Sequence, residues 1–294
     1  MTVLVIGGVG GMLAGALAAL PDVIAAGRPV ADLADEGTLA ATLDRHAPRA
    51  VICAGAFTDV DGAETAEVEA MHINADGPGA LARLCATRGT PLVHVSTDYV
   101  FDGSKVAPWV ETDFVAPLNA YGRSKLAGEA AVAAAGGRHA IVRASWVHAA
   151  HGKNFVRTML RAARARTALR VVDDQHGAPT YAPHLAAALL KIADTLSSST
   201  DDAHVGVFHA PPAGACTWRR FAEAIFEGSQ ARRGPYATVE PIATAEYPTP
   251  ARRPANSVLD GAKLQGVYGI ALPHWREGLD ACLDALAADG WKVD

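Results

Sequence analysis

The sequence has few cysteines, and they do not form a recognisable pattern. Only four occur among 294 residues, at Cys53, Cys85, Cys216 and Cys282, and no two of them form a CxxC pair. Without metal-ligand spacing or a dense cysteine framework, neither a cysteine-based zinc site nor a disulfide-stabilised fold is indicated. We therefore expect buried free thiols in a reducing compartment.

Signals for membranes, nucleic acids and metals are also missing. The chain enters the apolar run VLVIGG without the basic region and cleavage site of a signal peptide. No apolar run reaches the roughly 18 residues that span a bilayer. The net charge of −5 does not favour nucleic acid or an acidic membrane surface, and the eleven histidines form no HExxH-like motif. We expect a cytoplasmic protein with neither nucleic-acid nor membrane partners.

A strand, a glycine-rich turn and a small-residue helix open the chain. Val3–Ile6 is short, apolar and β-branched, which is typical of a strand buried on both faces. In the following GGVGGMLAGAL, the spacing of Gly8, Gly11 and Ala14 resembles a dinucleotide-binding turn. Glycines let the backbone approach a pyrophosphate, and the helix N-terminus offers it free N–H groups. The alternative is a tight turn with a purely structural role.

The end of the second predicted strand, near Val23–Ala25, bears on the choice of cofactor. An acidic residue at this tip would hold the ribose hydroxyl of NAD, but the sequence has Arg28 there. Arg28 could pair with the 2′-phosphate of NADP, or it could be a solvated surface residue. Asp32 and Leu33 could bracket the adenosine, although Asp32 could equally cap the next helix. We expect NADPH, with NADH as the alternative.

The remaining pattern predicts an α/β fold. Apolar segments at Ala50–Cys53, Pro91–Val95 and His139–Ser145 alternate with helical patterns at Glu36–Arg45 and Glu64–Thr87. Such alternation predicts a Rossmann-like, doubly wound parallel sheet, in which ligands bind at the carboxyl ends of the strands.

A change in composition predicts the domain organisation. We expect an NAD(P)-binding domain over residues 1–145 and a smaller α/β, mainly substrate-binding domain over residues 146–294. The apolar helical segment at about 181–197 should return to the first domain.

Two segments carry the candidate chemistry. HVSTDYVFDG ends a predicted strand in a hydroxyl and carboxylate cluster, and NAYGRSKLAGE places Tyr121 and Lys125 four residues apart. On a helix, that spacing puts both side chains on one face. A YxxxK pair is common by chance, and its ordinary interpretation is a surface pair. In this sequence the pair comes after the glycine turn and after a predicted strand that ends at Thr97, and this combination favours a catalytic role.

This combination suits the reduction of a carbonyl group. Hydride addition to a ketone leaves an alkoxide that needs a proton, and a phenol has a reference pKa near 10. An ammonium at Lys125 should lower the pKa of Tyr121 by roughly 2 to 3 units, or about 3 to 4 kcal/mol. Thr97 can hydrogen-bond the substrate carbonyl. Asp98 could orient a sugar hydroxyl, or it could simply end the strand.

The segments STDYVFDG, PLNAYGRSKLAGE, SWVHAAHGKNF and VVDDQHGAPTYA resemble the extended short-chain dehydrogenase/reductases, and within these the dTDP-4-dehydrorhamnose reductase family. The similarity runs from Leu4 to RRPANSVLD, which ends at Asp260. It implies reduction of the 4-keto group of a dTDP-linked 4-keto-6-deoxyhexose with NADPH or NADH.

The resemblance also assigns roles to residues. It implies that Tyr121 is the proton donor, Lys125 its partner and Thr97 the hydroxyl that holds the carbonyl. The cofactor contacts implied by the resemblance are Gly11, Met12, Leu13, Asp32, Leu33, Ala56, Phe57 and Thr58. The sequence patterns add Gly8, Arg28, Tyr121 and Lys125 to the expected cofactor contacts. The implied substrate contacts are Thr97, Asp98 and Trp146, with Trp146 stacking beside the deoxysugar or, alternatively, packing in the core.

Several positions depart from the family pattern. Some relatives bind magnesium at a dimer interface through glutamates, but one of these positions is Ala16 and the other falls near His184. We therefore predict no metal site, and we expect a monomer or a weak homodimer that binds a dTDP-sugar.

Two rival functions remain open. A sugar-nucleotide 4-epimerase or dehydratase would share the fold, although a dehydratase needs a Glu beside Asp98 that this sequence lacks. A non-catalytic, nucleotide-binding regulatory subunit is the second rival. The presence of Thr97, Tyr121 and Lys125 together argues against it.

Overall fold

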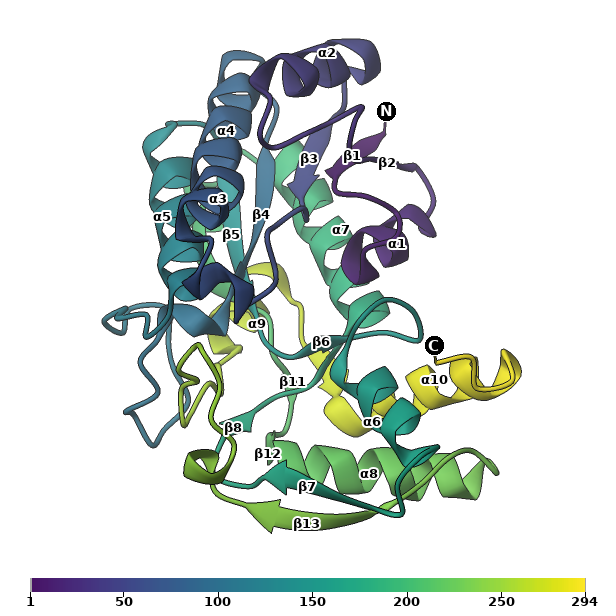
Figure 1. Cartoon of the computed structure of the whole chain (residues 1–294). Helices are drawn as coiled ribbons and strands as arrows, with labels where there is room; N and C mark the ends of the chain where they lie inside the picture. Colours follow the sequence, from purple (N-terminus) through teal and green to yellow (C-terminus); the bar gives the residue numbers. More distant parts are fainter. Residues whose placement is uncertain (1, 294) are drawn as a thin grey trace.

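The computed structural model describes residues 2–293, and a parallel sheet organises its upper part (Figure 1). Six strands lie in the order β10-β5-β4-β3-β1-β2, and every neighbouring pair is parallel. They are β1 (Val3–Ile6), β2 (Val23–Ala26), β3 (Ala50–Cys53), β4 (Leu92–Thr97), β5 (His139–Ala144) and β10 (Gly206–His209). The chain order reverses at β1, which has β2 on one side and β3 on the other. This confirms the predicted doubly wound fold and places the ligand-binding crevice beyond β1 and β3.

Helices cover both faces of this sheet (Figure 1). They are α1 (Met12–Ala18) and α7 (Ala182–Ser198) on one face, and α2 (Glu36–His46), α4 (Gly77–Thr87) and α5 (Ala120–Ala134) on the other. The strands are therefore covered on both sides, and all side chains of β1 and β3 are buried. This explains why their sequences are continuous apolar runs without alternation.

The helical pattern over 64–87 forms several segments in place of one helix. A 3₁₀ turn (Gly62–Glu64) precedes α3 (Glu67–Met71), a π-helical turn (His72–Asp76) follows, and α4 begins at Gly77. A Cβ at Gly77 would lie 2.3 Å from the Leu33 carbonyl oxygen, so only glycine fits where this helix crosses the loop after β2. The sequence predicted helical structure over this range, and it did not reveal the π turn.

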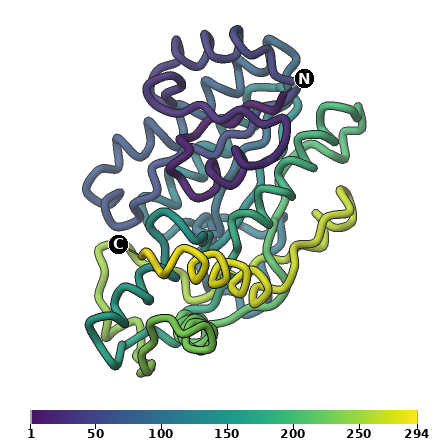
Figure 2. The backbone as a smooth tube through the Cα atoms, turned by 90° about the vertical axis from the view of Figure 1, so that its right-hand side faces the viewer, coloured from purple at the N-terminus to yellow at the C-terminus, as the bar shows by residue number. Residues whose placement is uncertain are grey.

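A second core lies below the sheet and is formed mainly by the second half of the chain (Figure 2). Its principal elements are α6 (Phe155–Ala163), β7 (Ala168–Val172), α8 (Trp218–Ala231), β13 (Thr238–Ile242) and α10 (Trp275–Ala288). β7 and β13 pair in parallel, and α8 and α10 pack together through residues such as Phe221 and Leu283.

Part of the second half packs against the sheet. Leu185, Leu189 and Ile192 of α7 belong to the same buried cluster as Val3 and Val5 of β1. α9 (Ala262–Tyr268) and β14 (Leu272–His274) also contribute to this cluster. A domain boundary at residue 145 stays a prediction.

The remaining elements are short. They are β6 (Val147–His148), β8 (His176–Gly177), β9 (Thr180–Tyr181), β11 (Pro212–Ala213), β12 (Cys216–Thr217), and 3₁₀ turns at Asp98–Val100, Asp202–His204 and Thr244–Glu246. All four cysteines are buried free thiols, as predicted. Among residues 2–293, no helix has the length and apolar character needed to cross a membrane.

Candidate active site

Thr97 lies at the carboxyl end of β4, where its side chain is almost fully buried. Its hydroxyl donates to Oδ1 of Asp98 at 2.8 Å and accepts from the backbone N–H of Tyr99 at 3.2 Å. The hydroxyl proton thus points to a carboxylate here. To donate to a substrate carbonyl, Thr97 must turn away from Asp98.

Tyr121 and Lys125 both lie in α5, as the sequence predicted. The Nζ of Lys125 is buried and donates to the carbonyl of Val95 in β4 at 2.7 Å, so the lysine ties the helix to the strand that ends in Thr97. Tyr121 stays partly exposed and interacts with the Thr97 hydroxyl. The three predicted catalytic side chains therefore converge at one strand end.

The expected acidification of Tyr121 is wrong for this structure. Burial and the negative charge of Asp98 raise the pKa of Tyr121 to about 12, and the contact with Thr97 only partly offsets them. Lys125 is not among the groups that act on this pKa. A phenol with this pKa is protonated at neutral pH, which is the state that a proton donor needs.

Asp98 is a buried acid whose charge acts on Tyr99 and Tyr121. Burial raises its pKa to about 6, although contacts with the hydroxyls of Ser257 and Thr97 lower it. Ser257 lies close to the carboxylate, but among the described residues no hydrogen bond of acceptable geometry reaches Oδ2. Oδ2 of Asp98 therefore has no hydrogen-bond partner among residues 2–293 and could accept a bond from a hydroxyl group of a ligand.

The glycine turn has the form that a pyrophosphate requires. The N–H of Gly11 donates to the carbonyl of Gly8 at 2.8 Å, and Gly11 begins α1 without a side-chain cap. Met12 and Leu13 are the first two residues of that helix. A Cβ at Gly8 would meet no atom within 4 Å, so the turn is open on this side.

The loop after β2 reaches this turn. A Cβ at Gly27 would lie 2.5 Å from the Cα of Gly8, so the backbone that carries Arg28 runs directly beside the turn. Arg28 itself is exposed. Asp32 accepts from the N–H of Ala34, whereas the cap of α2 is Asp35, so the alternative role of Asp32 as the helix cap is wrong.

Leu33 and the loop after β3 complete the predicted cofactor surface. Leu33 is buried, and its Cδ1 would lie 3.2 Å from a Cβ at Gly55. Ala56 and Phe57 are partly exposed and Thr58 is exposed in this loop. The small and open positions along the glycine turn and the β3 loop fit a dinucleotide.

Asn74 was not recognised as a site residue from the sequence. From the π turn, its side chain accepts from the N–H of Phe57 at 2.8 Å and donates to the carbonyl of Phe57 at 3.0 Å. It also donates to Ser124 at 2.9 Å, and Ser124 donates to the carbonyl of Tyr121. The amide thus connects the predicted cofactor loop to the catalytic helix. Asn74 stands among other polar residues in the segment His72–Asp76, so the sequence held no signal that it is special.

Trp146 follows β5 with a positive φ of 46°, which is unusual for a bulky residue. Its indole stacks on Trp218 with a centroid distance of 3.4 Å and an interplanar angle of 7°. A Cβ at Gly177 would lie only 2.3 Å from the same indole. Trp146 is thus held tightly at the junction of the two cores while staying partly exposed, and Trp218 was missed from the sequence.

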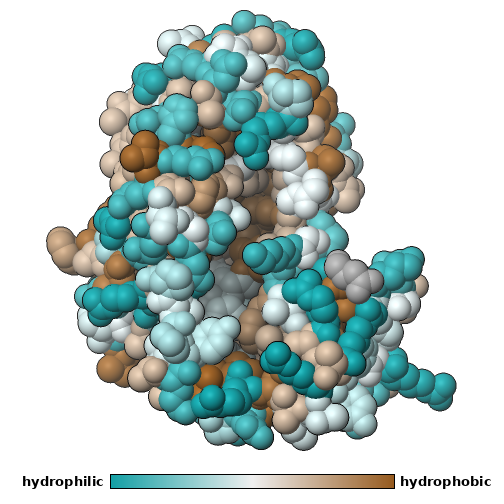
Figure 3. All heavy atoms as spheres, viewed as in Figure 1, coloured by the Kyte–Doolittle hydropathy of each residue, from teal (hydrophilic) through white to brown (hydrophobic). Residues whose placement is uncertain are grey.

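The face drawn in Figure 3 is hollowed between the upper and lower parts, with hydrophobic residues visible in its depth. A separate cavity of about 450 Å³ is lined by residues such as Pro108, Pro211 and Leu272, and none of the predicted site residues lines it. We place the candidate site at Thr97 and Tyr121 because the chemistry converges there.

No group of three or more His, Cys, Asp or Glu side chains within residues 2–293 is arranged to hold a metal ion. Ala16 is buried in α1 and cannot ligate a metal, and His184 is partly buried beside Tyr181. The absence of a magnesium site stays a prediction.

The chain matches the model of the RmlD substrate binding domain over residues 1–288. A curated dTDP-4-dehydrorhamnose reductase of Sinorhizobium fredii (strain NBRC 101917 / NGR234) is 44% identical over 274 residues, which are 92% of this chain and 93% of the relative. A solved structure of this reductase from Clostridium acetobutylicum superposes with a TM-score of 0.89 at 34% identity and covers 97% of this chain and 99% of that one. The reductase of Bacillus anthracis, solved in complex with NADP, gives a TM-score of 0.88 at 32% identity, with 97% and 100% coverage.

Proposed function

The chain belongs to the family of the RmlD substrate binding domain, and from this premise we propose that it reduces dTDP-4-dehydro-L-rhamnose to dTDP-L-rhamnose with NADPH. It is an NAD(P)H-dependent oxidoreductase, with NADH as the alternative cofactor. The observation that carries the proposal is the convergence of Thr97, Tyr121 and Lys125 at the end of β4.

The bound nicotinamide cofactor supplies the hydride for the C4 carbonyl. In the proposed mechanism, Tyr121 donates its phenolic proton to the oxygen that becomes an alkoxide. The raised pKa keeps Tyr121 protonated at neutral pH, which is the form that can donate to the alkoxide. Thr97 turns its hydroxyl from Asp98 to the carbonyl and holds it in line. Lys125 holds α5 against β4 through the Val95 carbonyl.

Substrate recognition is proposed to involve Asp98 and Trp146. The free Oδ2 of Asp98 is suited to accept a hydrogen bond from a sugar hydroxyl. Trp146 presents a partly exposed edge from the stack with Trp218, and that edge is proposed to contact the deoxysugar. The open turn at Gly8 and Gly11 is proposed to hold the cofactor pyrophosphate over Met12 and Leu13.

The remaining proposed cofactor contacts lie in the loops after β2 and β3. We propose that Asp32 and Leu33 lie beside the adenosine, and that Ala56, Phe57 and Thr58 line the cofactor at β3. Arg28 is proposed to pair with the 2′-phosphate, which is supported by the contact of its loop with the glycine turn.

Three further properties are proposed. Residues 1–145 would form the cofactor domain and residues 146–294 mainly the substrate domain, with a segment at about 181–197 returning to the first domain. A buried cluster drawn from residues after 145 and the packing of α7 against the sheet support this proposal. We propose a monomer or weak homodimer, and a cytoplasmic location, which the four buried free thiols support.

NADPH oxidation on addition of dTDP-4-dehydro-L-rhamnose, with the C4 stereochemistry of the product determined, tests this function. Formation of dTDP-L-rhamnose would support it. If the C4 epimer forms instead, the assigned product is wrong, and if no 4-keto sugar nucleotide oxidises NADPH, the reductase assignment itself fails.

A further inference from the structure

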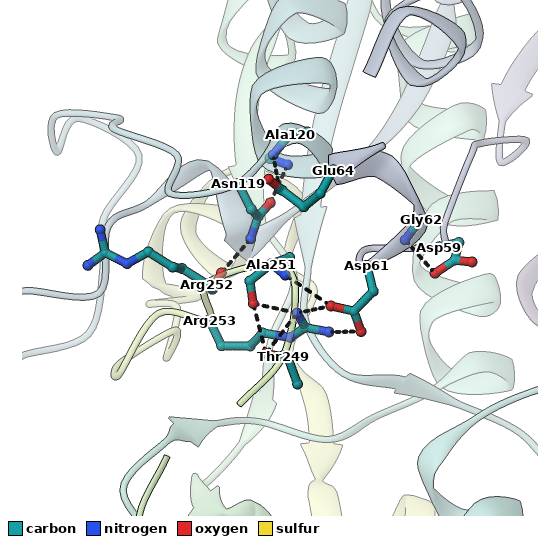
Figure 4. A network of polar contacts seen from close by, with 11 residues as sticks. Asp59, Asp61, Gly62, Glu64, Asn119, Ala120, Thr249, Ala251, Arg252 and Arg253 are labelled. Carbon is teal, nitrogen blue, oxygen red and sulfur yellow. Dashed lines mark hydrogen bonds and ion pairs between the residues drawn. The ribbon is translucent and has the colours of Figure 1, made fainter. Parts of the chain in front are cut away.

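A network of polar contacts surrounds the start of α5, just before the catalytic tyrosine (Figure 4). It joins three segments that are far apart in the sequence: the loop after β3, the cap of α5, and residues 249–253. We call its members Asp61, Glu64, Asn119, Arg252 and Arg253 the clamp. None of them was predicted as a site residue.

The clamp fixes the first turn of α5 from two sides. Asn119 caps the helix by accepting from the N–H of Gly122 at 2.8 Å, and it donates to the carbonyl of Arg252 at 2.8 Å. Glu64 accepts from the N–H of Ala120 at 2.7 Å. The first N–H groups of a helix have no partners within it, so these contacts set the place of the turn. Tyr121 is the second residue of that turn.

The segment that supplies the Arg252 carbonyl is itself held by an ion pair. Arg253 binds Asp61 through two hydrogen bonds of 2.6 and 2.9 Å, and the same carboxylate accepts from the N–H of Ala251 at 3.1 Å. Arg253 also donates to the carbonyl of Ala251 at 2.7 Å. Figure 4 shows the Arg252 side chain pointing away from this network, so only its backbone takes part. The pair is largely shielded on the Arg253 side, whose side chain is 18% exposed.

Arg253 is also linked to the ring of Tyr121 through Tyr99. Its guanidinium lies near the Tyr99 side chain, with which it interacts electrostatically. The ring of Tyr99 packs edge-on against the ring of Tyr121, with a centroid distance of 6.0 Å and an interplanar angle of 79°. Arg253 therefore contacts both the segment that holds the helix cap and the ring beside Tyr121.

We propose that the clamp positions Tyr121 for proton transfer, with Asp61 and Arg253 acting as one unit. The two residues do not react themselves; they are positioning residues. Four residues after Arg253 the same segment brings Ser257 to the Asp98 carboxylate. The clamp thereby joins the catalytic helix to a segment that also reaches the proposed substrate contact. This inference rests on the proposed reductase function.

The test is a double-mutant cycle on steady-state NADPH oxidation with dTDP-4-dehydro-L-rhamnose. Asp61→Asn and Arg253→Gln should each lower kcat by about ten- to a hundredfold, because small misplacements of a reacting group have effects of this size. The KM for the sugar nucleotide should change by less than about threefold, since ground-state binding is not removed. The double variant should be about as slow as the slower single variant.

Arg123→Gln is the matched control. It removes the ion pair between Arg123 of α5 and Glu67 at 2.8 Å, which is about 40% exposed on both sides. Glu67 is not part of the clamp, and Arg123 interacts with the clamp residue Glu64 only through its charge. It should change kcat by less than about twofold. An NADPH titration of each variant confirms that the cofactor site is intact.

Three results would overturn the proposal. If Arg253→Gln raises KM and leaves kcat unchanged, Arg253 binds substrate and does not position Tyr121. If the two single effects multiply in the double variant, the residues do not act as a unit. If both variants retain wild-type kcat, the clamp has no role in catalysis. An inactive wild-type protein would instead refute the reductase function on which the proposal rests.

Discussion

At the scale of single residues, the burial of Asp98 has consequences for stability. Its pKa of about 6 in the folded protein lies above the value of about 3.9 expected for an unfolded chain. The folded state therefore keeps the proton longer, and the free energy of unfolding falls as pH rises from about 4 to about 6 and stays lower above that. A difference of about two pKa units corresponds to a loss of about 3 kcal/mol.

Asp98→Asn should remove this loss, because an amide does not ionise. Relative to wild type, the variant should gain up to about 3 kcal/mol of unfolding free energy between pH 4 and pH 8. Urea unfolding at a series of pH values measures the difference. If the free energy of unfolding changes with pH in the same way for both proteins, the Asp98 carboxyl is not buried as described.

Arg28 is proposed to decide the preference between NADPH and NADH. Arg28→Ala should raise the KM for NADPH by roughly ten- to a hundredfold, because a charge-assisted hydrogen bond to a phosphate is worth about 1.5 to 3 kcal/mol. The KM for NADH should not change, since NADH lacks the 2′-phosphate. Initial rates with each cofactor provide the measurement, and equal effects on both would reject the assigned contact.

Residue identities were more predictable than residue environments. Tyr121, Lys125 and Thr97 were predicted from motifs, and the structure brings them together because helix periodicity and strand ends follow local rules. The pKa of Tyr121 was predicted in the wrong direction, because it depends on burial and on Asp98 in three dimensions. The role of Arg253 could not be predicted either, because its partner Asp61 is almost two hundred residues away in the sequence.

At the scale of secondary-structure elements, α5 depends on close approach to the π turn. A Cβ at Gly128 would lie 2.1 Å from the backbone carbonyl oxygen of Asn74. Gly128→Ala should lower the unfolding free energy by about 1 to 3 kcal/mol, because the backbone must move to admit the methyl group. Chemical denaturation measures the change.

Gly266→Ala is the control for this substitution. Gly266 is exposed in α9, and a Cβ there would meet no atom within 4 Å. Alanine should stabilise that helix by up to about 1 kcal/mol, so the two variants should shift stability in opposite directions. Destabilisation by both variants would mean that the close approach of α5 is not the cause.

Elements with strong local signals were predicted to within a few residues. β1 and β3 are apolar runs whose bounds match the prediction, and α2 has the expected apolar spacing. The π turn was missed because its backbone geometry follows from the packing of α5 and not from its own sequence. β7 and β13 were not predicted from the sequence. Each strand is exposed on one side, and each forms its ladder by pairing with the other.

At the scale of the whole molecule, the site depends on both halves of the chain. The sheet supplies the strand ends and α5, while residues 249–257 supply contacts to Asp61, Asn119 and Asp98. The fold class followed from alternating strands and helices. The apolar segment at about 181–197 was expected to return to the first domain, and α7 packs against the sheet. The polar contacts of residues 249–257 could not be predicted, because their partners are distant in sequence.

The central claim is that Tyr121 donates the proton in a reduction by NADPH. The most direct measurement compares the wild type with Tyr121→Phe in NADPH oxidation on dTDP-4-dehydro-L-rhamnose, together with NADPH titrations of both proteins. We expect turnover to fall by about a hundredfold or more in the variant, while NADPH binding is retained. Wild-type turnover in Tyr121→Phe would contradict the assignment of the proton donor.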